Sequence, residues 1–170
     1  MSANQIPASS VITADIATVK YFLSAEGNPN NDEAMYNIAA YHAQQAVEKA
    51  LKFYLREIFG EDENDRALKV HDIATLAGWL QLEYNADIPS EIIDRAEEIT
   101  DWEANSRYGH SLVTTRESIL SLVPLMEAVR DNVREIEEKI SKGISVSDSD
   151  IYAGEQDNSD LHNLYGTERL

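Results

Sequence analysis

The sequence predicts an all-α protein, built as an antiparallel bundle of five helices. Apolar residues recur at three- and four-residue spacing along most of the 170-residue chain, which is the period of an amphipathic helix. No stretch alternates apolar and polar residues for long enough to predict a strand. Hydrophobic residues make up 43% of the chain, which excludes wholesale disorder. The connections are short, so consecutive helices are expected to lie antiparallel.

The first two helices have clear boundaries in the sequence. Ser9 and Ser10 provide an N-cap signal before the first apolar stripe. That stripe consists of Ile12, Ile16, Val19 and Leu23. The second helix is expected over about residues 32–59, ending at Gly60, and it is long enough to form the spine of a bundle. Its polar side carries Gln45, Glu48, Lys49, Lys52 and Arg56.

Three further helices follow. The third is expected to start near His71 and Asp72, and the fourth after Pro89, which suits a first helical turn. Residues 105–110 interrupt the pattern before the last helix. That helix is expected from Thr114, which has capping-box spacing to Glu117. Pro124 predicts a kink in it or a later start.

The same pattern predicts the domain organisation. Residues 1–10 are expected to form a flexible lead and residues 11–142 the helical domain. Residues 143–170 are expected to form an acidic, disordered tail, because residues 145–170 hold six acidic residues and one arginine.

Composition limits the functions that the chain can have. It has 14 Lys and Arg against 31 Asp and Glu, a formal net charge of −17, which excludes non-specific DNA binding. It has no cysteine, so thiolate metal sites and disulfides are excluded. No apolar run is long enough to cross a membrane and no signal peptide is present, so a cytoplasmic protein is expected. No motif for a cofactor or a metal is recognised.

One segment resembles a known family. The run Tyr41-His42-Ala43-Gln44-Gln45-Ala46-Val47-Glu48-Lys49-Ala50-Leu51-Lys52 is similar to the second helix of the HEPN family. Three other segments follow the family's order, namely Ala14-Asp15-Ile16-Ala17, Val70-His71-Asp72-Ile73-Ala74-Thr75-Leu76 and Ser106-Arg107-Tyr108. The resemblance covers about residues 11–142. It implies a four-helix up-and-down bundle with an accessory helix, a homodimer, and a nucleotidyltransferase-type protein partner.

The resemblance also implies chemistry, because some members are metal-independent RNases with an Arg-x4-6-His motif near the last core helix. In those members the histidine acts as acid or base and the arginine stabilises the phosphate. Here Arg107 and His110 stand at that place with only two residues between them. Arg66 and His71 have the literal spacing, but they precede the third helix, so we interpret this match as coincidence. RNase activity is left open.

Each candidate residue has a functional and a structural interpretation. Arg107 and His110 are the catalytic candidates. The alternative for Arg107 is an ion pair with Glu103, with Asp101 or with an acid of the second helix, and the alternative for His110 is a solvated loop histidine. Arg107, Tyr108, Lys49, Lys52 and Gln45 are the candidates for nucleotide or RNA binding, and a solvated helix face is the alternative for the lysines. His71 and Asp72 form either a second acid/base pair or a helix cap with a packing residue.

Two functional hypotheses follow. In the first, the chain is a HEPN-type homodimer that works with a nucleotidyltransferase-type partner and contacts nucleotide or RNA at a dimer cleft, in a toxin–antitoxin or defence role. In the second, it is a non-catalytic helical dimerisation or interaction module without nucleic-acid contact, which the acidic composition favours.

Overall fold

The computed structural model describes residues 6–24, 32–60, 66–108 and 114–151, with residues 32, 33 and 104–108 described by their backbone alone. Within these ranges the regular elements are all helical. The α-helices are α1 (Ala8–Ser24), α2 (Asp32–Phe59), α4 (Ile73–Gly78), α5 (Ser90–Asp94), α6 (Ala96–Tyr108) and α7 (Arg116–Ser141). Two irregular helices complete them, the π-helix η1 (Trp79–Glu83) and the 3-10 helix η2 (Asp148–Asp150).

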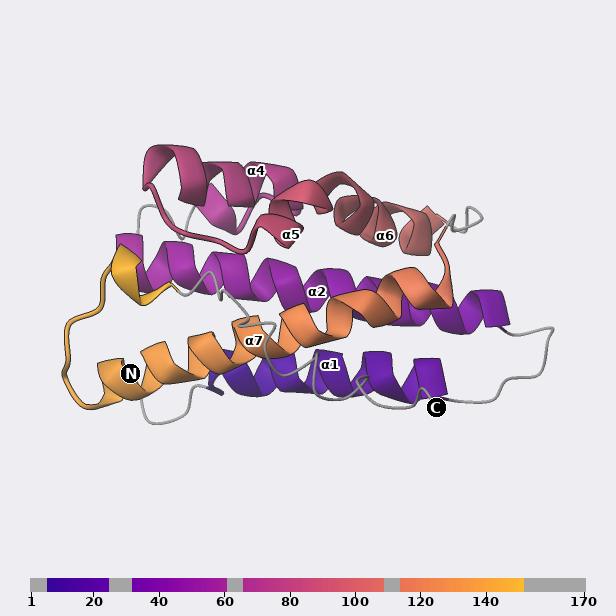
Figure 1. The fold of residues 1–170 in the computed structure, drawn as a ribbon, viewed down its shortest axis with the longest axis horizontal. Coiled ribbons are helices and arrows are strands. Elements are labelled where there is room, and N and C mark those ends of the chain that lie inside the picture. Colours follow the sequence, from indigo (N-terminus) through magenta and orange to yellow (C-terminus); the bar gives the residue numbers. More distant parts are fainter. Residues whose placement is uncertain (1–5, 25–31, 61–65, 109–113, 152–170) are drawn as a thin grey trace, which may run out of the picture.

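The core is a four-helix bundle of α1, α2, α6 and α7. Consecutive core helices run in opposite directions, and α4, η1 and α5 form an accessory layer beside α6 (Figure 1). The long helix α2 packs against α1, α4, α6 and α7, so it is the spine of the fold. The predicted all-α, up-and-down bundle with an accessory helical part is therefore confirmed.

The apolar stripes meet inside this bundle. The first stripe is buried as predicted, as are most apolar positions of α7. Burial of these side chains is the main source of stability, at about 25 cal/mol for each Å² removed from water. Gly60 ends α2 with a φ of 106°, a conformation that glycine adopts without steric cost.

Several predicted boundaries differ from the structure. Helix α1 begins at Ala8 rather than after Ser10, because the Glu137 carboxylate of α7 accepts hydrogen bonds from Ala8 N, at 2.6 Å, and from Ser9 Oγ. A carboxylate at a helix N-terminus satisfies unpaired N–H groups and favours the helix dipole. In α7 the N-cap is Thr115 rather than Thr114, since Thr115 Oγ1 accepts from Ser118 N at 3.1 Å.

The predicted fourth helix is divided in two at Arg95, and α6 continues to Tyr108 instead of ending before residue 105. Arg95 terminates α5, and its guanidinium bonds to Glu98 and to Ser118 of α7. These bonds fix the break by attaching it to the neighbouring helix.

The chain beyond α7 folds back on the bundle. Gly143, with a φ of 70°, turns the backbone, and Ile144 N donates to Lys139 O at 2.9 Å. Asn132 of α7 donates to the carbonyl of Asp150 at 2.8 Å, and Ile151 is buried in the core. The expected boundary at residue 142 therefore falls before a packed segment, and the rest of the expected tail lies outside the described residues.

Candidate functional site

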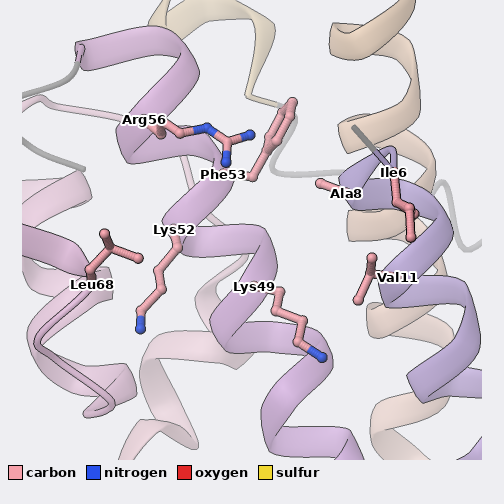
Figure 2. Close-up of a pocket in the computed structure, with 8 residues that line it drawn as sticks. All are labelled: Ile6, Ala8, Val11, Lys49, Lys52, Phe53, Arg56 and Leu68. Atoms are coloured by element: carbon pink, nitrogen blue, oxygen red, sulfur yellow. The ribbon is translucent and has the colours of Figure 1, made fainter. Parts of the chain in front are cut away.

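A pocket opens on α2, between the N-terminal part of α1 and the segment around Leu68. Its volume is about 280 Å³, near the lower end of the range for small-ligand sites. The N-terminal part of α1 forms one wall and the segment around Leu68 the opposite wall (Figure 2). The lining residues are Ile6, Ala8, Val11, Lys49, Lys52, Phe53, Arg56 and Leu68.

Three cations of α2 share this pocket. Lys49, Lys52 and Arg56 follow one another at spacings of three and four residues, which places them on one face of the helix. All three side chains are half-buried. The Arg56 guanidinium lies 5.8 Å from the centre of the Phe53 ring, and its Nε donates to Glu57 Oε1 at 2.5 Å. A strongly acidic chain thus gathers positive side chains at a pocket.

The first lysine is held by a buried acid of α1. Lys49 Nζ donates to Asp15 Oδ2 at 2.6 Å, and His42 Nδ1 lies 2.8 Å from Asp15 Oδ1. A carboxylate only accepts hydrogen bonds, so His42 presents a protonated Nδ1 to it. Asp15 is 6% exposed, so its charge is compensated from both sides in a nearly water-free place.

The second lysine is held in the same way by a buried acid of α2. Lys52 Nζ lies 2.7 Å and His71 Nδ1 lies 3.0 Å from the same atom, Glu48 Oε1. The other carboxylate oxygen of Glu48 accepts from Gln44 Nε2 at 2.6 Å. Each of the two buried carboxylates beside the pocket therefore carries one lysine and one histidine.

A polar network continues from Glu48 toward α6. Gln44 Nε2 also lies 3.4 Å from Glu103 Oε2, and Gln45 Nε2 donates to Gln44 Oε1 at 2.7 Å. Glu48, His71 and Glu103 place donor atoms within 4.8 Å of one another, so this group has the residue types and spacing to hold a divalent ion. Lys52 and Gln44 occupy oxygens that an ion would need.

The structure brings together some of the predicted residues. Gln45, Lys49, Lys52 and His71 lie on or beside the open face of α2. Arg107 and Tyr108 lie in the last turn of α6, and Arg107 is one helical turn beyond Glu103. His110 lies outside the described residues.

Two further pairs stood out in the sequence, His71 with Asp72 as an alternative acid/base pair and Arg66 with His71 as a coincidental match, and in both the members have different partners. Asp72 is the N-cap of α4, with Thr75 N donating to its Oδ1 at 2.6 Å, while His71 faces Glu48. Arg66 donates to both carboxylate oxygens of Glu83, at 2.8 and 2.9 Å, and its guanidinium lies 3.6 Å from the Trp79 ring centre. Arg66 and His71 therefore have different partners, although their spacing matches the RNase motif.

The sequence reasoning missed the buried acids and the third cation. No sequence motif marks Asp15 or Glu48 as a site residue. Each, however, lies at helical spacing from apolar core positions, where a buried acid needs a partner. Arg56 continues the spacing of Lys49 and Lys52, and that spacing was the signal that could have found it.

Comparison with known proteins decides the family. A family model described as HEPN domain matches residues 20–136, which is most of the chain. The chain belongs to the HEPN domain family. None of the curated proteins and none of the solved structures matches it significantly.

The range matched by the family model covers only part of the candidate site of this HEPN domain. It includes the α2 cations, both histidines and Arg107. It leaves out Asp15 and the α1 wall of the pocket, which precede residue 20. Among the described helices none is long and apolar enough to cross a bilayer.

Proposed function

We propose that this HEPN-domain chain works as a homodimer with a nucleotidyltransferase-type partner, and that it contacts nucleotide or RNA at a cleft between two copies. Gln45, Lys49 and Lys52 of α2 and Arg107 and Tyr108 of α6 supply the contacts. The role is of the toxin–antitoxin or defence type.

The observation that carries this proposal is the cationic face of α2. Lys49, Lys52 and Arg56 line one pocket in a chain of net charge −17. A phosphate group is bound by Lys and Arg side chains through charge-assisted hydrogen bonds. Local positive charge of this kind allows one phosphate to bind even where the whole molecule repels a long polyanion.

The C-terminal end of α6 supports the proposal because it lies beside the polar network of α2. Glu103 is linked through Gln44 to Glu48, and Arg107 follows Glu103 by one helical turn. Arg107, the arginine to which the family resemblance assigns a role, therefore lies in the helical turn next to the network that holds Lys52. A guanidinium there would add a bidentate phosphate contact.

The test uses purified chain and short labelled RNA, with fluorescence anisotropy for binding and gel electrophoresis for cleavage. The Arg107→Ala/His110→Ala double variant and the Lys52→Gln variant are expected to weaken binding about tenfold, the worth of one charge-assisted bond. Lys20→Gln is the matched control, because Lys20 pairs with Glu127 on the surface and does not line the pocket. Cleavage that the double variant loses supports an RNase activity.

The dimer and the partner need their own measurements. Light scattering during size-exclusion chromatography gives the mass of the assembly, which is expected to be twice that of the chain. Co-expression with a nucleotidyltransferase-type protein, followed by nuclease treatment, is expected to give a stoichiometric complex. A monomer at micromolar concentration contradicts the homodimer.

The second candidate is a non-catalytic dimerisation or interaction module. The overall charge favours it, since an RNA-binding surface gains from a positive surround that this chain lacks. A stable protein complex together with no binding of RNA or nucleotide by the wild-type chain would select this candidate.

A further inference from the structure

The pocket on α2 is a groove with apolar walls. Five of its eight lining residues are apolar, namely Ile6, Ala8, Val11, Phe53 and Leu68. Ile6 and Leu68 stand on opposite sides of it and are 71% and 59% exposed (Figure 2). Large aliphatic side chains that are exposed together around a hollow indicate a binding surface, whereas singly scattered ones do not.

The three cations of the groove do not stand in the way of an apolar occupant. Lys49, Lys52 and Arg56 each have an acid as partner, so their charges are balanced locally. The aliphatic stems of lysine and arginine side chains can be covered by apolar groups while the charged ends keep their partners. An apolar segment can therefore lie over this face of α2 without stranding a charge.

The segment after α7 leads to this groove. Asn132 of α7 donates to the carbonyl of Asp150 and accepts from the hydroxyl of Tyr54. Tyr54 is the neighbour in α2 of Phe53, which lines the groove. Figure 1 agrees with these contacts, because η2 lies next to the C-terminal end of α2. Ile151, where the described part of the chain stops, is thus anchored close to the groove.

A second line of contacts gives the same placement. Ala8, on the α1 wall of the groove, donates its N–H to Glu137 of α7. Lys139, two residues further along α7, pairs with Asp150. The two walls that end at Ala8 and Phe53 are therefore both tied to the segment that precedes residue 152.

The sequence beyond the described residues contains an apolar stripe that suits such a groove. Leu161, Leu164 and Tyr165 have the spacing of residues that share one face of a helical turn. Asp160, directly before them, is of a type preferred at an N-cap, and Gly166, directly after them, is of the type preferred beyond a helix end. Apolar residues at this spacing are the anchors by which a helical segment binds a hydrophobic groove.

The connection is long enough for this stripe to reach the groove of its own chain. Residues 152–160 separate Ile151 from Leu161, and extended they reach about 30 Å. The groove extends along α2 from Lys49 to Arg56, which is about 10 Å of helix. A segment tethered so closely has an effective concentration in the millimolar range, which favours it over a separate partner.

We propose that residues 161–165 dock as one helical turn in the groove on α2, with Leu161 and Leu164 between the walls that carry Ile6 and Leu68. Burial of apolar surface drives this docking. Asp160 adds at most an exposed ion pair with a groove lysine, and such pairs contribute little. The inference goes beyond the proposed function and does not depend on it.

The first experiment measures proximity in the full chain. The chain has no cysteine, so one introduced cysteine carries a nitroxide spin label at a single place. Lys69→Cys places the label beside Leu68, at an exposed position. This label is expected to broaden the amide proton signals of Leu164 and Tyr165 by paramagnetic relaxation. Signals of full intensity overturn the docking.

Glu117→Cys is the control position for the label. Glu117 is exposed and lies about 30 Å along α7 from Glu137, the residue that contacts Ala8 of the groove. A label there is expected to leave the signals of Leu164 and Tyr165 sharp. Equal broadening from both positions overturns a specific docking site.

Two double variants test the apolar face of the segment. In the Lys69→Cys chain, Leu161→Ser/Leu164→Ser is expected to abolish the broadening of Tyr165. His162→Ser/Asn163→Ser changes the other side of the same turn and is expected to keep it. Broadening that survives the loss of both leucines overturns the proposal.

The groove side is tested without a label, by amide hydrogen exchange. Exchange at Leu164 and Tyr165 is expected to be slowed about tenfold, as for a segment docked nine-tenths of the time. Leu68→Ser is expected to remove this protection. Leu82→Ser is the matched control, because Leu82 is 82% exposed and does not line the groove. Thermal unfolding checks that both variants are folded, and equal protection in the two overturns the assignment of the groove.

A mixing experiment shows which chain supplies the segment. Unlabelled protein that carries the spin label at Lys69→Cys is mixed with nitrogen-15-labelled wild-type protein. The signals of Leu164 and Tyr165 are expected to stay sharp. Broadening in the mixture assigns the groove to the segment of a second copy and overturns docking within one chain.

Docking also has a consequence for the proposed nucleotide contact, and this consequence rests on the proposed function. A docked segment covers Lys49 and Lys52, so RNA has to displace it. Leu161→Ser/Leu164→Ser is therefore expected to bind the short RNA about tenfold tighter than the wild-type chain. Equal affinities overturn this competition. No RNA binding by either protein overturns the proposed function and leaves the docking, which the spin label tests separately.

Discussion

The Lys49 ammonium lies 2.6 Å from Asp15 Oδ2, and this contact joins α1 to the cationic face of α2. Asp15 belongs to the apolar side of α1, which also carries the buried residues Ile12, Ile16 and Val19. An acid placed there is compatible with folding because α2 supplies both Lys49 and His42 to it. This interhelical contact therefore joins the α1 wall of the pocket to one of the three cations that line it.

Asp15→Asn tests the structural worth of this contact. The amide keeps the size of the side chain but removes the charge that holds Lys49 and His42. The free energy of unfolding at pH 7 is expected to fall by about 1–2 kcal/mol, which is less than for a fully buried pair because Lys49 can return to water. Urea unfolding followed by circular dichroism measures it. Asp131→Asn is the control, with a side chain 50% exposed and an expected change below about 0.5 kcal/mol. Equal losses in the two variants would contradict the role given to Asp15.

Tyr54→Phe tests the connection between α2, α7 and the segment after α7. The Tyr54 hydroxyl donates to Asn132 Oδ1 at 2.8 Å, and Asn132 donates onward to the carbonyl of Asp150. Burial raises the pKa of Tyr54 well above its usual value, so the hydroxyl stays protonated as a donor at all ordinary pH values. Removing it is expected to lower the free energy of unfolding by about 1–2 kcal/mol, measured in urea. Tyr21→Phe, at an exposed tyrosine, is the control and is expected to have no effect.

Asp150 is expected to make the packing of residues 144–151 sensitive to acid. The Lys139 ammonium beside it, together with the Ser147 backbone N–H, lowers the pKa of Asp150 below its usual value. A lowered pKa in the folded state means that the contribution to stability is present above the unfolded-state pKa, near 4, and is lost as the pH falls through the folded-state value.

Asp150→Asn removes this dependence. Unfolding free energies measured between pH 7 and pH 3 are expected to fall less steeply for the variant than for the wild-type chain below pH 4. Amide hydrogen exchange of Ile151, which donates to the carbonyl of Asp148, reports whether the segment has loosened. Parallel curves for the two proteins would show that this carboxylate does not anchor the segment.

The long helices could be predicted because their apolar residues repeat with the helical period over many turns. The stripe of α1 and the broad face of α2 each specify one buried side, whatever the partner is. Gly60 ended α2 as predicted, because the need for a positive φ is a local property. Asp72 was likewise a local signal, and it caps α4.

The remaining features depend on contacts between distant residues. The start of α1 is set by Glu137 from the other end of the domain, and the break at Arg95 is fixed by Ser118 of α7. Likewise, Glu48 looked like part of a solvated face, yet it is 4% exposed because His71 and Gln44 surround it. Spacing along one helix could bring Lys49 and Lys52 together but could not show which acids lie behind them.

Pro124 provides a test of helix strain outside the site. The sequence predicted a kink or a start later than Thr114, and α7 does start later, at Arg116, and is helical through Pro124 to Ser141. Proline in a helix interior lacks the N–H for the carbonyl four residues earlier and costs up to about 3 kcal/mol relative to alanine. Its ring is exposed, so little packing is lost on truncation. Pro124→Ala is therefore expected to raise the free energy of unfolding by about 1–3 kcal/mol in urea.

Pro89 is the matched control for this prediction. It is the N-cap residue of α5, with a φ of −51° that suits the proline ring, so its substitution removes no helical strain. Pro89→Ala is expected to leave stability unchanged or to lower it slightly, because the unfolded chain gains freedom. If Pro124→Ala gives no increase while Pro89→Ala behaves as expected, α7 has already relieved the strain by local distortion. The carbonyl of Leu120, four residues before Pro124, would then be the group to examine by amide-proton and carbonyl chemical shifts.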